Sequence, residues 1–162
     1  MACCLLKALT NCLLTKHRLM NFGIITDDTC VLCNSSPETT DHLFFSYEFS
    51  TYIWSRCKLK LGLLPVIHPL QVEASEFQKT YTHKTKLSAL GLVTLSTTVW
   101  HQWKERNNRV FQLTMQTKLE VFNKLRLTSW LLLNSAHGRL IVATMVCKSL
   151  ATRTCLIALS WM

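Results

Sequence analysis

The chain has 162 residues, of which 49% are apolar and 17% are charged. This composition excludes an intrinsically disordered protein and predicts a folded body of one domain, or of a small domain with a tail. Lysine and arginine total 18 against nine acidic residues, for a net charge of +9, and such a surplus favours polyanionic partners, chiefly nucleic acid.

Residues 2–22 are predicted to form one or two helices. Thr15 is a candidate N-cap, and Gly23 is a candidate for the residue just past a helix C-terminus. The chain has only four glycines and three prolines, so helix-breaking residues are sparse and long helices are expected.

Residues 26–41 are rich in Asp, Asn, Ser, Pro and Thr and are predicted to be a turn-rich loop. The tetrapeptide Cys30-Val31-Leu32-Cys33 lies in the middle of this loop. The short apolar run at residues 42–45 fits either a strand fragment or the start of a helix.

A helix is predicted over residues 50–61, with Ser50 as its N-cap and Gly62 at its end. Residues 63–82 hold two of the chain's three prolines and are predicted to be a connecting loop.

A long helix is predicted over residues 84–111, because apolar residues recur there at three- and four-residue steps. The next helix, over residues 117–133, starts at a capping box formed by Thr117 and Glu120. The predicted fold is therefore mainly α: a small knuckle-like loop module packed with several helices, with little or no sheet.

Residues 140–162 are the most apolar stretch, but Lys148 and Arg153 lie within it. A membrane-spanning helix needs about 20 predominantly apolar residues with few or no charges. We therefore expect no membrane association, and interpret the tail as a buried helix or one that pairs with itself or with a partner.

Eight cysteines are a high count for this length. A secreted disulfide scaffold would need a signal peptide, and the apolar segment at residues 2–6 is interrupted by Lys7. We therefore expect reduced thiols and an intracellular protein. Cys30 and Cys33 are the one pair with the spacing of metal ligands.

The pattern Cys30-x2-Cys33-x8-His42 can hold a tetrahedral zinc ion, because two thiolates from a tight turn and an imidazole from the next element are typical zinc ligands. A CxxC motif also occurs in redox enzymes, where it opens a helix beside a parallel sheet. No such sheet is predicted here.

Several further motifs accompany this pattern in a fixed order. They are Leu14-Thr15-Lys16-His17-Arg18-Leu19, Phe22-Gly23-Ile24, Cys30-Val31-Leu32-Cys33, Glu38-Thr39-Thr40-Asp41-His42-Leu43-Phe44-Phe45, Phe49-Ser50, Trp54, Trp100-x2-Trp103-x2-Arg106-Asn107-Asn108 and Phe111. In this arrangement the sequence resembles the zinc-binding region that follows the reverse transcriptase in plant LINE-type (non-LTR) retrotransposons.

The resemblance covers residues 13–112, with a knuckle core at 26–62 and a following helix at 84–112. Residues 113–162 are then a helical C-terminal extension. The resemblance implies a non-catalytic, zinc-knuckle nucleic-acid-binding module from a reverse transcriptase polyprotein, with RNA or DNA as partner and a nuclear location. It also implies that the chain is a fragment without the polymerase.

The chain departs from the family pattern at Tyr47, where the family has a fourth cysteine four residues after the histidine. A phenol keeps its proton at neutral pH and is a poor zinc ligand. Water could complete the tetrahedron, Glu48 or Cys57 could replace the missing thiolate, or the site could stay empty. The last outcome gives the alternative interpretation: a degenerate helical structural or interaction protein with no zinc and no selected function.

Eight cations are candidates for phosphate contacts, with an ordinary solvated helix face as the competing interpretation. They are Lys16, Arg18, Arg56, Lys58, Lys60, Lys104, Arg106 and Arg109. Trp100, Trp103 and Trp130 could stack on bases, but their spacing among aliphatic residues favours core packing.

No catalytic site is predicted, and no small-molecule substrate. Asp27 and Asp28 are interpreted as solvated loop residues, because polymerase chemistry needs a further carboxylate on another strand. No acidic residue follows Glu120, which leaves the C-terminal part without the carboxylates of a ribonuclease H, and no GxSxG motif occurs.

Overall fold

A computed structural model describes residues 1–81 and 86–134 of the chain. In chain order its elements are α1 (Ala2–Leu9), α2 (Lys16–Asn21), the π-helical turn η1 (His42–Ser46), α3 (Glu48–Lys60), α4 (Leu70–Tyr81), α5 (Lys86–Phe111) and α6 (Lys118–Asn134). The described residues contain no strand beyond an isolated bridge between Thr29 and Pro37. The predicted mainly α fold is confirmed.

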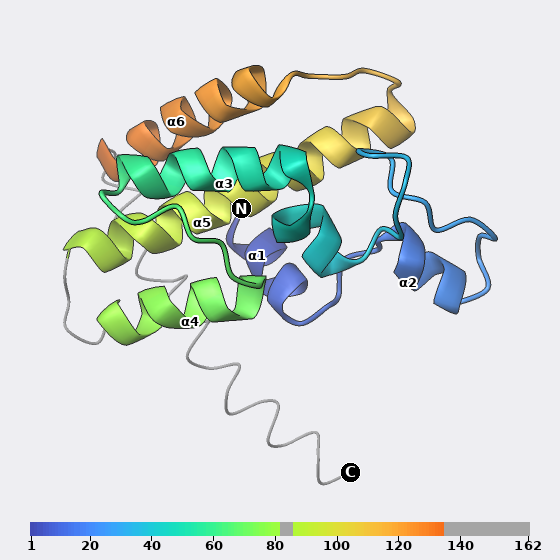
Figure 1. Cartoon of the computed structure of the whole chain (residues 1–162), viewed down its shortest axis with the longest axis horizontal. Helices are drawn as coiled ribbons and strands as arrows, with labels where there is room; N and C mark the ends of the chain where they lie inside the picture. Colours follow the sequence, from blue (N-terminus) through green and yellow to red (C-terminus); the bar gives the residue numbers. More distant parts are fainter. Residues whose placement is uncertain (82–85, 135–162) are drawn as a thin grey trace, which may run out of the picture.

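Helix α5 is the central element of the fold. It contacts α1, α3, α4, α6 and η1, and α3, α4 and α6 run beside it in Figure 1. With 26 residues it is about 39 Å long. Helix α2 and the loop that follows it lie together at one end of the molecule.

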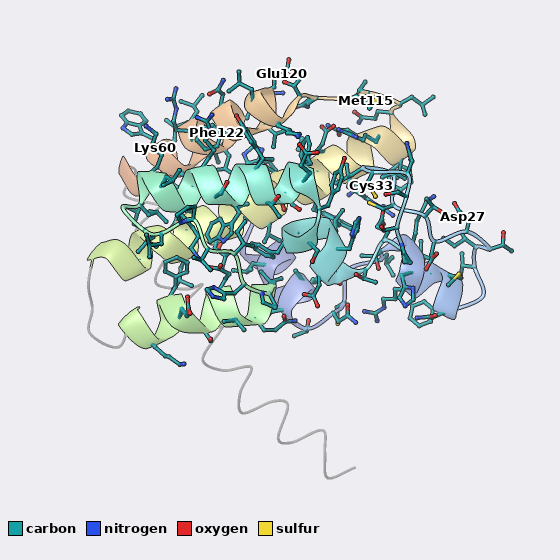
Figure 2. The ribbon with its side chains drawn as sticks, in the orientation of Figure 1. Asp27, Cys33, Lys60, Met115, Glu120 and Phe122 are labelled. Atoms are coloured by element: carbon teal, nitrogen blue, oxygen red, sulfur yellow. The ribbon has the colours of Figure 1, made fainter. Side chains whose placement is uncertain are left out.

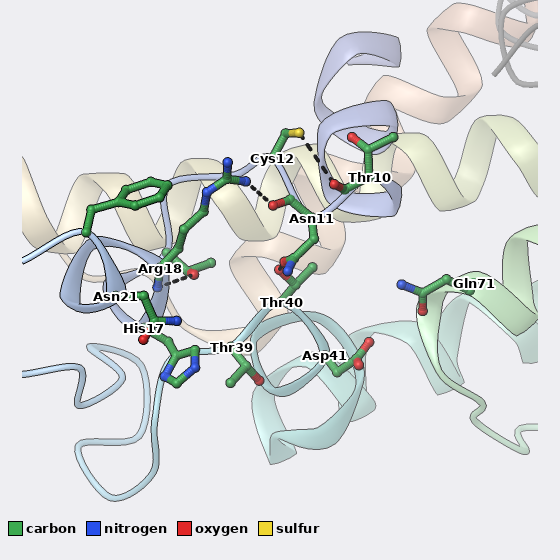
Figure 3. Close-up of a pocket in the computed structure, with 12 residues that line it drawn as sticks. Thr10, Asn11, Cys12, His17, Arg18, Asn21, Thr39, Thr40, Asp41 and Gln71 are labelled. Carbon is green, nitrogen blue, oxygen red and sulfur yellow. Dashed lines mark hydrogen bonds between the residues drawn. The ribbon is translucent and has the colours of Figure 1, made fainter. Parts of the chain in front are cut away.

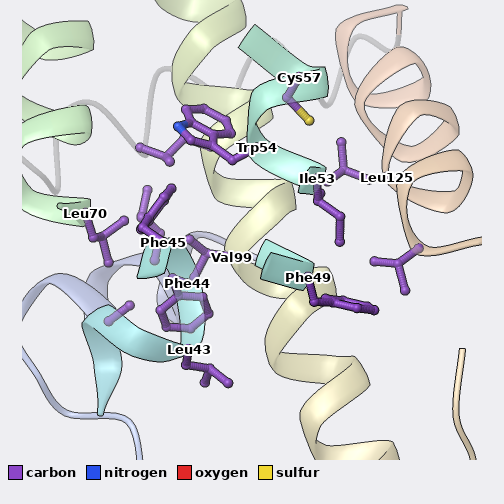
Figure 4. Close-up of a cluster of buried hydrophobic side chains, with 14 of the residues drawn as sticks. Leu43, Phe44, Phe45, Phe49, Ile53, Trp54, Cys57, Leu70, Val99 and Leu125 are labelled. Carbon is purple, nitrogen blue, oxygen red and sulfur yellow. The ribbon is translucent and has the colours of Figure 1, made fainter. Parts of the chain in front are cut away.

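The apolar core gathers where η1, α3, α4, α5 and α6 meet (Figure 4). The ring of Trp54 on α3 meets Phe45 of η1 and Phe77 of α4 edge to face, with centroids 5.9 and 6.2 Å apart. Such pairs contribute about 0.5–1.5 kcal/mol each beyond the area they bury. Val99 of α5 and Leu125 of α6 are buried in the same cluster.

Three predicted helix boundaries are confirmed. The Thr15 hydroxyl accepts a hydrogen bond from the backbone N–H of Arg18 at 3.4 Å, so Thr15 caps α2. Gly23 and Gly62 follow the last residues of α2 and α3 with φ of +69° and +73°, a conformation that glycine adopts without steric cost.

The predicted capping box at the start of α6 is also present. The side chain of Glu120 accepts from the backbone N–H of Thr117 at 2.7 Å, and the Thr117 hydroxyl accepts from the backbone N–H of Glu120 at 3.2 Å. These two bonds satisfy donors that the first turn of a helix otherwise leaves unpaired.

The prediction of a connecting loop over residues 63–82 is wrong, because α4 occupies most of this segment. Pro69 stands directly before the helix, where a missing N–H costs nothing. Leu70, Ala74 and Phe77 then recur at helical spacing and are all buried. Phe77 packs so closely on α5 that a Cβ at Gly91 would lie 2.2 Å from its ring.

Two smaller corrections concern the start of α3. The helix begins at Glu48 rather than at Ser50, and the buried Ser50 hydroxyl donates instead to the carbonyl of Tyr47 at 2.8 Å. Residues 42–45 form part of η1, so the strand alternative for this run is wrong. Their three apolar side chains are all buried.

Helix α3 is joined to α4 by a buried ion pair. The Lys58 ammonium lies 2.8 and 3.0 Å from the two carboxylate oxygens of Glu73, and neither side chain is more than 6% exposed. Lys58 was predicted to contact phosphate, but here its charge is used within the fold.

The helix predicted for the apolar tail, at residues 140–162, lies outside the described residues. Among residues 1–81 and 86–134, no helix combines the length and apolar composition needed to cross a membrane.

His101 makes the stability of the fold depend on pH. Burial, together with the charges of Lys104 and Lys124, lowers the pKa of His101 to about 4 from 6.5. The unfolded chain therefore binds a proton that the folded chain excludes, so the free energy of unfolding should fall as pH drops from about 6.5 towards 4. Urea unfolding of the wild type and of His101→Gln at pH 7.5 and 4.5 measures this effect. An equal loss in both proteins would contradict it.

Candidate metal centre

The loop that carries the two cysteines is folded by its own backbone. The N–H of Cys30 donates to the carbonyl of Ser36, and the N–H of Asn34 donates to the carbonyl of Cys30, both at 2.8 Å. Asn34 has φ of +54°, a left-handed conformation that asparagine tolerates. These bonds close a tight turn, which brings Cys33 back beside Cys30.

Three potential metal ligands meet at this turn. The sulfur atoms of Cys30 and Cys33 and a ring nitrogen of His42 all lie within 4.8 Å of one another. Cys33 Sγ is 3.3 Å from His42 Nε2. His42 opens η1, where the Thr39 hydroxyl accepts a hydrogen bond from its backbone N–H at 3.1 Å. Two sulfur donors and one imidazole match the ligand chemistry of zinc.

The environments of the two thiols differ. Burial opposes ionisation of Cys33, but hydrogen bonds from the side chain and backbone of Ser35, from His42 and from the Ser36 backbone outweigh it and lower the pKa of Cys33 to about 6. Burial raises the pKa of Cys30 to about 11. At neutral pH the metal-free cluster therefore carries one thiolate, which suits a first metal contact.

A second group of candidate ligands consists of His68, Glu73 and Glu76. The Glu73 carboxylate is already paired with the ammonium of Lys58, and a cation bound there would have to displace that charge. The cysteine cluster is therefore the stronger metal site among the described residues.

Tyr47, which stands where the resemblance places a fourth cysteine, does not offer its oxygen to the cluster. Its hydroxyl donates to the carbonyl of Leu32, inside the cysteine turn, at 3.0 Å. Its ring lies beside that of His42, with centroids 5.7 Å apart. Tyr47 thus holds the turn by a hydrogen bond.

The two substitute ligands considered from the sequence lie elsewhere. Glu48 is paired with Lys118 of α6. Cys57 is buried on α3, with its sulfur 3.8 Å from the hydroxyl of Thr98. Neither joins the cluster of three ligands.

The cysteine loop is tied to α5 by Glu38. One carboxylate oxygen of Glu38 accepts from Nε and Nη2 of Arg106 at 3.0 and 2.7 Å. The same oxygen accepts from the backbone N–H of Lys16, at the start of α2, at 2.9 Å. The Glu38 side chain is 0% exposed and that of Arg106 only 4%. Arg106, predicted to contact phosphate, is instead a structural counter-ion.

The remaining predicted cations differ in exposure. Arg109 is largely covered and forms an ion pair with Glu105 at 2.8 Å. Lys16 lies 3.1 Å from Asp27. The side chains of Arg18, Arg56, Lys60 and Lys104 are half-buried or exposed.

Lys60 lies near the cysteine loop in the sequence but far from it in space. Helix α3 carries it to the opposite end of the molecule from Cys33, as Figure 2 shows.

The core packing predicted for the tryptophans holds only in part, and the paired aspartates form local contacts. Trp103 packs against the core, whereas the prediction is wrong for Trp130, whose side chain is 58% exposed. Asp27 caps the loop by accepting from the Thr29 backbone at 3.0 Å, and Asp28 lies 2.7 Å from a ring nitrogen of His17.

A surface pocket of about 610 Å³ adjoins the knuckle and was not predicted from the sequence. Figure 3 shows its lining of polar side chains from the α1–α2 connection, from α2 and from the segment before His42. Arg18 donates to the carbonyl of Asn11 at its rim. Residues of mixed type far apart in sequence line the pocket, so no local motif marks it.

Residues 1–54 match the family model described as zinc-binding in reverse transcriptase. The matched segment contains Cys30, Cys33 and His42 and ends within α3. The predicted similarity to a reverse transcriptase zinc-binding region is confirmed over these residues. Comparisons with curated proteins and with solved structures gave no match.

Removing one partner of the Glu38–Arg106 pair should destabilise the protein strongly. Arg106→Ala leaves a buried, unpaired carboxylate, and we expect a loss of about 3–5 kcal/mol in the free energy of unfolding. Arg56→Ala, an exposed arginine on α3, is the matched control and should change stability by less than about 0.5 kcal/mol.

The double variant Glu38→Gln/Arg106→Met separates pairing from packing. Because it removes both charges and keeps a hydrogen-bond acceptor for Lys16, it should lose much less than Arg106→Ala. Chemical denaturation of the four proteins gives these values. Equal losses in the single and double variants would show that the ion pair is not the cause.

Zinc binding should release about one proton per chain near pH 7.5, because Cys33 is already ionised and Cys30 must lose its proton to become a ligand. Between about pH 6 and pH 11 the affinity should rise about tenfold per pH unit. Calorimetry in two buffers of different ionisation enthalpy measures the released protons. Release of no proton or of two would contradict the assigned thiol states.

Proposed function

We propose that this protein is a non-catalytic zinc-binding module that binds nucleic acid, derived from the reverse transcriptase polyprotein of a plant LINE-type retrotransposon and acting in the nucleus. The observation that carries the proposal is the meeting of Cys30, Cys33 and His42 in one turn, within the segment that matches the family. The zinc ion would hold the turn together and carry out no chemistry of its own.

Support for zinc comes from the donors and from how they are held. Two sulfurs and one imidazole nitrogen lie close enough to share an ion. The turn is also preformed, because its backbone bonds and the Tyr47 hydroxyl hold it. A preformed site loses less conformational entropy when the metal binds.

Support for nucleic acid comes from charge. The chain carries a net charge of +9, which favours contact with phosphates and release of counterions. Arg18, Arg56 and Lys104 also lie over the rings of Phe22, Tyr52 and Trp100, at 5.2, 5.1 and 5.2 Å from the ring centroids. Surfaces that pair cations with aromatic rings suit single-stranded RNA or DNA, whose bases stack on such rings.

Among the candidate cations, Arg18 is the one we propose to contact phosphate next to the metal site. It belongs to α2, next to the cysteine loop, and lines the pocket beside the knuckle. Phe22 is 56% exposed and lines the same pocket, so a phosphate and a base could be held together there. Lys16 stands on the same short helix, whereas Arg56, Lys60 and Lys104 would contact a longer strand.

The proposed module spans residues 13–112, which includes α5, and residues 113–162 are a C-terminal extension. The Glu38–Arg106 pair supports the inclusion of α5, because the cysteine loop is anchored to that helix. Helix α6 packs on α5 as well, so the extension begins as part of the folded body.

A second candidate function is a helical interaction protein without zinc. Helix α6 exposes Leu119, Leu127 and Leu131, each more than half accessible. An apolar pocket of about 300 Å³ also lies between α3, α5 and α6, lined in part by Leu61 and Phe122. These features favour a protein partner on the face formed by α6.

Binding of the zinc-loaded full chain to fluorescent single-stranded RNA, single-stranded DNA and duplex DNA tests the proposal. Affinity should fall linearly with salt on a log–log scale, by about 0.7–0.9 per phosphate contacted. Arg18→Ala should weaken binding to all sequences and reduce the slope by about 1.

Arg126→Ala, an exposed arginine on α6, is the matched control and should leave affinity and slope unchanged. Equal effects of the two variants would mean that net charge alone causes the binding. If the chain binds no nucleic acid even at low salt, the proposed nucleic-acid function is wrong, and the helical interaction protein becomes the favoured candidate.

A further inference from the structure

The cysteine cluster supplies three ligands where a structural zinc site normally has four. Among the described residues, no other histidine, cysteine, aspartate or glutamate brings a donor atom into the group formed by Cys30, Cys33 and His42. The described residues therefore supply a bound metal with three ligands, and a fourth ligand would have to come from another source.

The neighbouring side chain cannot easily supply that ligand, because Tyr47 is already engaged. Its hydroxyl donates to the Leu32 carbonyl at 3.0 Å, and Arg109 Nη1 lies 3.4 Å from the same oxygen. Turning the Tyr47 oxygen towards the metal would break the bond that holds the turn and would also require loss of the phenolic proton.

The site can be reached from solvent. Cys30 is buried, whereas Cys33 and His42 are each partly exposed. The cluster therefore lies at the surface of the loop, with Cys30 on its buried side and Cys33 and His42 on its solvent side. A small ligand can approach it without any rearrangement of the helices.

We propose that the metal held by Cys30, Cys33 and His42 keeps one open coordination position and binds a small external thiol there as a thiolate. This inference rests on the proposed zinc site. Two thiolates and an imidazole make a soft donor set, and zinc with such ligands accepts a further sulfur readily. In the exchange, the sulfur of the incoming thiol replaces a bound water molecule, and the proton of the thiol passes to the solvent.

Cobalt(II) reports this coordination directly, because its sulfur-to-metal charge-transfer absorption counts cobalt–thiolate bonds. The full chain is loaded with one equivalent of cobalt(II) and titrated with β-mercaptoethanol, with Cys33→Ser as the background. The absorption should rise by about half and saturate at one thiol per chain, as two Co–S bonds become three.

Two variants of Tyr47 make the test specific. Tyr47→Cys should fill the fourth position, so its spectrum should already show three thiolates and should not respond to added thiol. Tyr47→Phe keeps the ring but loses the hydrogen bond to Leu32, so it should bind cobalt less tightly. Once loaded with cobalt, it should still gain about half again in absorption when thiol is added, because its fourth position is open as in the wild type.

The outcomes separate this inference from the proposed function. If the wild type binds cobalt but does not respond to thiol, or loses the cobalt to the thiol, then the proposed open position is wrong. The proposed metal site would still stand. Failure of the well-folded chain to bind cobalt or zinc would overturn both the zinc site and this inference.

Discussion

The ion pair between Glu38 and Arg106 joins the cysteine loop to the helical body. Both side chains are buried, so each charge is tolerable only because the other is present. The same Glu38 oxygen accepts from the first N–H of α2, which places α2, the loop and α5 in one arrangement. The segment that matches the reverse transcriptase zinc-binding family ends at residue 54, yet its loop is held by a residue of α5. The helices that follow the matched segment are thus part of what positions the candidate metal site.

Two kinds of constraint shape the cysteine turn. Backbone hydrogen bonds and the Tyr47 hydroxyl act with or without a metal, whereas Cys30, Cys33 and His42 would act only when an ion joins them. In a site with four protein ligands the metal itself contributes much of the folding free energy. Here the chain holds three ligands in place by ordinary contacts, so the metal would be added to a loop that already has its shape. This division would let a site with three protein ligands keep its geometry without a fourth.

Much of the fold could be predicted from local sequence signals. Thr15, Gly62 and the Thr117–Glu120 pair act within a few residues of themselves, so the helix ends that they set were predictable. The spacing of the two cysteines likewise indicated their turn. Helix α4 was missed because the two prolines before it suggested a loop. The apolar residues Leu70, Ala74 and Phe77 do recur at helical spacing, but so short a pattern indicates a helix only once α5 is there to cover it. The roles of Lys58 and Arg106 could not be predicted either, since their partners lie 15 and 68 residues away. A cation looks the same in sequence whether it faces solvent or a buried carboxylate.

The proposed function depends on the binding of one zinc ion by Cys30, Cys33 and His42. Native mass spectrometry of the purified full chain, alongside Cys33→Ser and Cys57→Ser, tests it most directly. Cys57 is the matched control, because it is a cysteine of α3 that packs against Thr98 outside the cluster. One zinc per chain is expected in the wild type and in Cys57→Ser, and none in Cys33→Ser. A well-folded wild type without zinc, or equal zinc in all three proteins, would contradict it.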